Sequence, residues 1–175
     1  VKRQLLGVLD ADIGAHGALA RNTLEFLGTE PQGLNKVHGA APYGRLVVQN
    51  PFDVDGLSLG VFGLYAELYP AGNTALGTDK YTDLGFDVSY QHVIDDMNLL
   101  AFNGTLIQEW QRLDSTHAAG DSANLRNRLT NAKLNASYYY NQAIGLTVGY
   151  FNVWGTRDSG LFAPDPIGGS RTGSP

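Results

Sequence analysis

The feature that most constrains this chain is a strict alternation of apolar and polar residues over residues 81–91. One side of this segment carries Leu84, Phe86, Val88 and Tyr90, and the other carries Asp83, Gly85, Asp87, Ser89 and Gln91. A period of two places neighbouring side chains on opposite faces of a β-strand. The pattern predicts a strand with an apolar environment along one whole side and a polar one along the other. The wall of a membrane β-barrel is the leading interpretation.

Seven further segments alternate in the same way between turn-forming residues, so the sequence predicts an all-β fold. We expect eight antiparallel strands in an up-and-down order, at residues 4–13, 18–26, 41–49, 57–68, 81–91, 99–112, 128–140 and 145–154. The segment 18–26 is also compatible with a short helix that ends at Gly28. Since no internal repeat divides the chain, we expect residues 1–175 to form a single domain.

The connections between these segments alternate in length. Short turns are expected at 14–17, 50–56, 92–98 and 141–144, and long loops rich in Gly, Pro, Asn, Asp and Ser at 27–40, 69–80, 113–127 and from residue 155 onward. Outer-membrane barrels sort their connections in this way, with the long loops on the outside of the cell. Most of the segments also reach the 9 to 11 residues, roughly, that a tilted strand needs to cross a bilayer.

Aromatic residues collect near the ends of the apolar faces. Tyr90, Tyr138 and Tyr140 lie next to short turns, whereas Trp110 and Trp154 lie toward long loops. Rings with a polar tip favour membrane interfaces, so these five residues predict two interfacial belts. The alternative is a set of cross-strand aromatic pairs in the sheet of a soluble protein.

Charged and amide side chains fall opposite the apolar stripes. The predicted pore-lining set is Arg45, Glu67, Asp83, Asp87, Asn103, Glu109 and Lys133. In a wide barrel such residues set the solute preference of an aqueous channel, and in a narrow one they pair with each other and plug it. The acidic members outnumber the basic ones, which favours cations. The alternative is the solvated face of a soluble sheet.

Composition and motifs exclude several other classes. The 17% of charged residues lies below the roughly 25% of soluble domains. A net charge of -5 without a basic run argues against nucleic-acid binding. The sequence contains no apolar stretch of about 18 residues, which a membrane-spanning helix would need. The chain has no cysteine, its four histidines lack metal-ligand spacing, and no catalytic serine motif occurs. We expect no enzyme activity, no metal and no cofactor.

The stretches 39–45, 103–110 and 155–158 resemble bacterial outer-membrane porin-like proteins, in particular those found near c-type cytochromes. The resemblance covers most of the chain through barrel-wall patterns and includes no catalytic residue. It implies a transmembrane barrel in the outer membrane, embedded in the lipid bilayer, that conducts small solutes or ions by passive diffusion. It also implies two possible protein partners, a c-type cytochrome and further copies of this chain.

Three alternatives stay open at this point. The barrel could be a scaffold that sheathes a cytochrome without transporting solute, or the chain could be a soluble β-sandwich or lipocalin-like binding protein. The predicted first strand starts, and the last ends, on the long-loop side, which differs from complete barrels and predicts an interior piece of a larger one. A closed barrel of eight strands is the third alternative.

Overall fold

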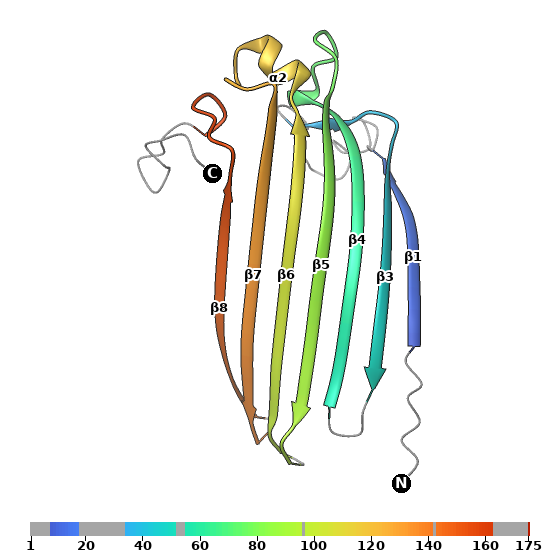
Figure 1. Cartoon of the computed structure of the whole chain (residues 1–175), viewed down its shortest axis with the longest axis vertical. Helices are drawn as coiled ribbons and strands as arrows, with labels where there is room; N and C mark the ends of the chain where they lie inside the picture. Colours follow the sequence, from blue (N-terminus) through green and yellow to red (C-terminus); the bar gives the residue numbers. More distant parts are fainter. Residues whose placement is uncertain (1–7, 18–33, 52–54, 96, 142, 163–174) are drawn as a thin grey trace, which may run out of the picture.

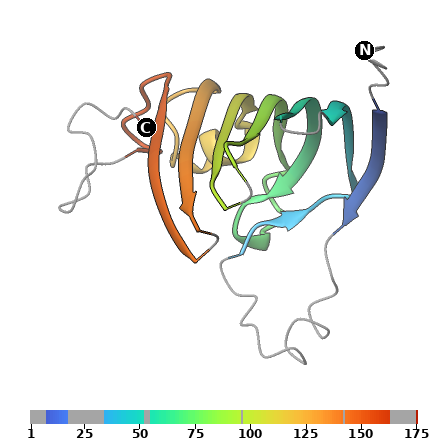
Figure 2. The ribbon, with the colours of Figure 1, turned by 90° about the horizontal axis from the view of Figure 1, so that it is seen from below.

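The structure is a computed structural model that describes residues 8–17, 34–51, 55–95, 97–141, 143–162 and 175. The described residues form one antiparallel sheet in the order β1-β3-β4-β5-β6-β7-β8, and the short strand β2 pairs with β4 (Figure 1). The strands are β1 (Val8–Gly17), β2 (Lys36–Val37), β3 (Ala40–Pro51), β4 (Asp55–Tyr69), β5 (Asp79–Val93), β6 (Leu99–Arg112), β7 (Arg126–Tyr140) and β8 (Ile144–Gly155). The sheet is an open wall, with β1 and β8 at its two edges (Figure 2).

The all-β prediction is confirmed, and seven of the eight predicted segments are strands of this sheet. The predicted segment 99–112 has the observed bounds of β6. Five of the other long strands keep the predicted centres and differ at their ends, whereas β1 extends to Gly17, four residues beyond the predicted end. The remaining segment, 18–26, and residues 4–7 of the first segment lie outside the described residues.

The predicted turn at 14–17 is wrong. These four residues continue β1, which pairs with β3 from Val8 opposite Gln49 to Gly17 opposite Ala40. Two glycines suggested a turn, but an antiparallel ladder to β3 satisfies their backbone groups instead. Because β1 pairs directly with β3, β1 begins at the short-turn end of the sheet, in contrast to the sequence-based expectation.

The predicted sorting of the connections is confirmed from β3 to β8. Residues 52–54, 94–98 and 141–143 join strands at one end of the sheet, whereas 18–39, 70–78 and 113–125 join them at the other (Figure 1). In the turn after β5, the Asp95 carboxylate accepts hydrogen bonds from the backbone N–H groups of Met97 and Asn98. The sheet therefore has a short-turn end and a long-loop end.

The register of the strands divides the sheet into two faces. We call the apolar face the one that carries Leu46, Val48, Leu59, Val61, Leu84, Phe86, Leu106, Leu134, Val148 and Tyr150. The polar face carries Arg45, Asp83, Asp87, Asn103, Thr105, Glu109, Gln111 and Lys133. On the apolar face Leu84 is 57% exposed and Val148 is 67% exposed. The apolar face is therefore open to its surroundings.

Very little apolar surface is buried among the described residues. The buried hydrophobic residues are Ala41, Val47, Ala66, Ala101 and Leu113. Only Leu113 is a large side chain, and it lies outside the strands, directly after β6. The backbone ladders between the strands, rather than a hydrophobic core, hold this sheet together.

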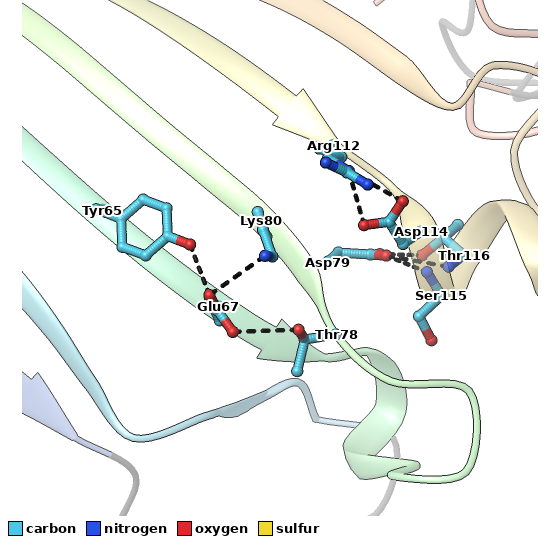
Figure 3. A network of polar contacts seen from close by, with 9 residues as sticks. All are labelled: Tyr65, Glu67, Thr78, Asp79, Lys80, Arg112, Asp114, Ser115 and Thr116. Atoms are coloured by element: carbon cyan, nitrogen blue, oxygen red, sulfur yellow. Dashed lines mark hydrogen bonds and ion pairs between the residues drawn. The ribbon is translucent and has the colours of Figure 1, made fainter.

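Two buried carboxylates organise the long-loop end. The first, Asp79, is fully buried and accepts hydrogen bonds from the backbone N–H groups of Ser115 and Thr116, at 2.7 and 3.1 Å, and from the Thr116 hydroxyl (Figure 3). These N–H groups belong to the first turn of the short helix α2 (Asp114–Ala119), whose free donors need acceptors. A residue of β5 thus fixes the loop that follows β6.

The second carboxylate, Asp158, is 1% exposed and joins the loop after β8 to the loop before β7. Its oxygens accept hydrogen bonds from Ser122 Oγ at 2.6 Å, Asn127 Nδ2 at 2.8 Å and the backbone N–H groups of Ala123 and Leu161. Burial alone would raise the pKa of Asp158, but these hydrogen bonds outweigh it and hold the pKa below the ordinary carboxyl value.

Replacing Asp158 with Asn removes the charge but keeps the shape, and we expect it to cost about 1.5 to 3 kcal/mol of local stability. Hydrogen-exchange protection of the Ala123 and Leu161 amides measures this loss. Since the pKa is lower in the folded state, the stabilisation is present above the ordinary carboxyl pKa of 3.8 and is lost as the pH falls below it. Protection factors that are unchanged both in Asp158→Asn and at pH 3 would contradict the assignment.

Candidate functional site

The polar face brings together six of the seven predicted pore-lining residues. Asp83 is paired with Glu109 across β5 and β6, Asn103 with Asn135 across β6 and β7, and Lys133 with Thr105, which in turn is paired with Asp87. Arg45 occupies the same face of β3, opposite Phe62 of β4. The six side chains therefore share one face of the sheet, on the four strands β3, β5, β6 and β7.

Glu67 does not belong to this set. It lies on the apolar face, two residues beyond Tyr65, whose hydroxyl donates a hydrogen bond to Glu67 Oε1 at 2.6 Å. The pairing of β4 with β3 and β5 places Phe62, Leu64, Ala66 and Leu68 on the polar face instead. The sequence of β4 has apolar residues in both parities, so its alternation alone is ambiguous. Leu59 is paired with Val88, and Val61 with Phe86, so the odd-numbered residues of β4 lie on the apolar face.

An ion pair spans three strands of the polar face. Arg45 on β3 reaches across β4 to Asp87 on β5, with Nη2 to Oδ1 at 2.7 Å and Nε to Oδ2 at 3.4 Å. The residue between them on β4 is Gly60, where an added Cβ would lie 2.6 Å from the Asp87 carboxylate. The absence of a side chain at Gly60 gives Asp87 the room to reach Arg45.

A second glycine makes room for an aromatic ring on the same face. The tip of the Phe62 ring lies over Gly85, where an added Cβ would come within 2.0 Å of Phe62 Cζ. Tyr43 packs against Phe62 with ring centroids 6.4 Å apart. The polar face therefore has an aromatic patch beside its ion pair, in the part formed by β3, β4 and β5.

Three acidic and amide side chains gather nearer the long-loop end. Asp83 and Glu109 are paired in register, and Gln111 Nε2 donates a hydrogen bond to Glu109. Asp83 Oδ1 and Gln111 Oε1 are buried and have no hydrogen-bond partner among the described residues. Buried acceptors without donors are costly, and two adjacent carboxylates repel anions. This part of the polar face thus combines two paired carboxylates with two acceptors that have no donor among the described residues.

All five aromatic residues predicted for the interfacial belts lie on the apolar face. Tyr90, Tyr138 and Tyr140 lie at the short-turn end, and Trp110 and Trp154 lie at the long-loop end. The sequence reasoning missed Tyr65, which occupies the row of Trp110 because Thr82 is paired with both. The prediction that puts Glu67 on the polar face also puts Tyr65 there, because the two residues are two positions apart on one strand. The aromatic side chains thus form two levels with aliphatic residues between them.

The distance between the two levels can be obtained from β6. Leu100, paired with Tyr138, and Trp110 are ten residues apart on this strand. At about 3.3 Å per residue this is ~33 Å along the strand. A strand tilted by about 40° then covers ~25 Å, which is the height of the apolar band of outer-membrane barrels.

The described residues offer little for other chemistry. Among them, no three side chains of His, Cys, Asp or Glu are grouped in a way that could hold a metal ion. None of the helices in the described part of the chain has the length and apolar character that a bilayer crossing requires. No family model, curated protein or solved structure matches this chain.

Because the Asp87 carboxylate occupies the space next to Gly60, a side chain added at this position should disrupt the ion pair. We expect Gly60→Ala to separate Asp87 from Arg45, because the new methyl group occupies the space of the carboxylate. In a double-mutant cycle of Arg45→Gln and Asp87→Asn, the coupling energy should fall from about 1 kcal/mol to near zero in this background. Urea unfolding in lipid vesicles measures the coupling.

The matched control is Gly63→Ala on the same strand. Gly63 lies on the apolar face, and its added Cβ would meet only the Asp83 backbone oxygen, at 3.5 Å. The coupling between Arg45 and Asp87 should be kept in this variant. Equal coupling in the Gly60→Ala and Gly63→Ala backgrounds would contradict the role of Gly60.

Proposed function

We propose that this chain forms part of the wall of a bacterial outer-membrane porin-like β-barrel. The apolar face lies against the lipid bilayer, and the polar face lines an aqueous path for the passive diffusion of small solutes or ions. The observation that carries the proposal is the exposed apolar face, bounded by two aromatic levels, on a sheet whose other face is polar.

Exposure of this apolar face to water would cost much free energy. The face extends over β1, β3, β4, β5, β6, β7 and β8. Its exposed large side chains range from 93% exposure at Ile13 to 37% at Tyr65, and Leu57, Val88 and Tyr90 are half-buried. Soluble monomers rarely expose a continuous apolar patch larger than a few hundred Å². Lipid chains remove this cost, and the aromatic levels suit the two interfaces. A soluble β-sandwich would need a second sheet to cover the apolar face.

The backbone also favours a barrel. A sheet in a bilayer must close, because an edge strand exposes unpaired N–H and C=O groups to lipid. The seven long strands are fewer than the eight of the smallest barrels. The proposal therefore includes further strands that pair with β1 and β8, the edge strands of the sheet that the described residues form.

The polar face has the character of a channel lining. Besides the buried Asp79, the described polar face carries five carboxylates, against the two cations Arg45 and Lys133; they are Asp10, Asp12, Asp83, Asp87 and Glu109. Since Arg45 neutralises Asp87, the excess negative charge remains on the pair of Asp83 and Glu109 and on the two carboxylates of β1. Rings of acidic side chains select for cations. We therefore expect a weakly cation-selective path.

Reversing the charge of the lining tests this function. We expect Asp83→Lys and Asp87→Lys to shift the reversal potential under a KCl gradient from cation preference toward anion preference. The measurement uses the chain reconstituted in planar bilayers. Glu67→Lys is the matched control, because it makes the same charge change on the apolar face and should leave selectivity unchanged.

Three other outcomes of this experiment would each contradict a different part of the proposal. Equal shifts in Asp83→Lys and Glu67→Lys would mean that the polar face is not the lining. A protein that inserts in the bilayer but carries no current would contradict the channel and favour a barrel that sheathes a partner. A protein that stays in solution without detergent would contradict the membrane wall itself.

A further inference from the structure

A row of cations crosses three neighbouring strands at the long-loop end. Lys80 on β5 is paired with Arg112 on β6, and Arg112 is paired with Arg126 on β7. All three lie on the side of the apolar face, two residues beyond the level of Thr82, Trp110 and Arg128. The row is thus adjacent to the aromatic level at the long-loop end and lies on the side of that level away from the aliphatic residues.

The nearby carboxylates compensate only part of this charge. Lys80 Nζ lies 3.7 Å from Glu67 Oε1, and Arg112 Nε lies 2.8 Å from Asp114 Oδ2 (Figure 3). Within the described residues, neither Arg126 nor Arg128 has a carboxylate partner. Arg128 lies over the Trp110 ring, 5.8 Å from its centroid, and donates a hydrogen bond to Gln108 at 2.9 Å. Like charges in paired positions destabilise a sheet unless an anion lies between them.

Among the described residues, the short-turn end carries the opposite charge. Its described residues include Asp55 and Asp95, and the sequence has no Lys or Arg between Arg45 and Lys80 or between Lys80 and Arg112. Both of these intervals contain a short turn and the adjoining strand ends. The two borders of the apolar face therefore differ in charge, which a general need for solubility does not explain.

We propose that Lys80, Arg112, Arg126 and Arg128 bind the phosphate groups of anionic lipids in the leaflet at the long-loop end. This inference rests on the proposed membrane wall, because it assigns the level of the row to the headgroup region. The side chains of Lys80 and Arg112 are 41% and 51% exposed, and Arg126 and Arg128 are also exposed. The guanidinium group binds phosphate oxygens in a bidentate manner, so arginine suits this role.

Trp110 offers a direct probe, because the chain has only two tryptophans and Trp110 lies beneath Arg128. In a Trp154→Phe background, Trp110 fluorescence is quenched only by brominated lipids close to this site. The chain is reconstituted in phosphatidylcholine vesicles that contain either brominated phosphatidylglycerol or brominated phosphatidylcholine. The ratio of the two quenching curves gives the relative binding constant of the anionic lipid.

We expect the anionic lipid to be preferred, and Arg126→Gln to lower the relative constant about fivefold, as about 1 kcal/mol per surface cation predicts. Lys133→Gln is the control: it removes one cation from the same strand but from the polar face, and it should keep the preference. Arg126→Lys should keep most of the preference, which separates a loss of charge from a failure to fold.

The unfavourable outcomes are distinguishable. Equal quenching by both brominated lipids, or equal losses in Arg126→Gln and Lys133→Gln, would overturn the lipid phosphate site and leave the membrane wall intact. Absence of quenching by either lipid would overturn the membrane wall and the phosphate site together.

Discussion

The backbone ladder between antiparallel strands is the constraint on which the rest of this structure depends. It fixes the face of every residue, because a shift of one position would exchange the two faces completely. From Arg45 on β3 to Lys133 on β7, the ladder places six of the seven side chains predicted to line a pore on the polar face, and it places Glu67 on the apolar face. Leu113 is the only large apolar side chain buried among the described residues. The apolar residues therefore do not form a core, and their stabilising effect depends on what surrounds the sheet.

Glycines and buried carboxylates adapt this simple ladder in two places. On the polar face, Gly60 and Gly85 leave room for the Asp87 carboxylate and the Phe62 ring, so side chains on strands that are not neighbours come into contact. At the long-loop end, Asp79 and Asp158 accept backbone hydrogen bonds from segments more than 30 residues away in sequence. At the short-turn end, Asp95 bonds its own turn, while Asn98 accepts a hydrogen bond from the Asn141 N–H of the neighbouring turn. Polar contacts between segments distant in sequence therefore occur at both ends of the sheet.

Much of this fold follows from local pattern, and the exceptions have physical reasons. The segment 99–112 has a clear alternation, and β6 has these bounds. The face of Glu67 could not be read from β4 alone, since both of its parities contain apolar residues, and only the partner strands decide between them. The turn predicted at 14–17 was wrong because glycine is compatible with both a turn and a strand. The roles of Asp79 and Asp158 depend on contacts between distant loops, which no local pattern contains.

The central claim is that the two faces meet different media, lipid on one side and water on the other. Since the chain has no cysteine, single nitroxide labels can be placed at each position from 102 to 107 of β6 in lipid vesicles. Electron paramagnetic resonance then measures collisions with oxygen, which concentrates in lipid, and with a nickel complex, which stays in water. The account predicts that the two accessibilities alternate with a period of two and in opposite phase, with oxygen favoured at Leu106 and nickel at Thr105. Accessibilities that rise and fall together along the strand would contradict it.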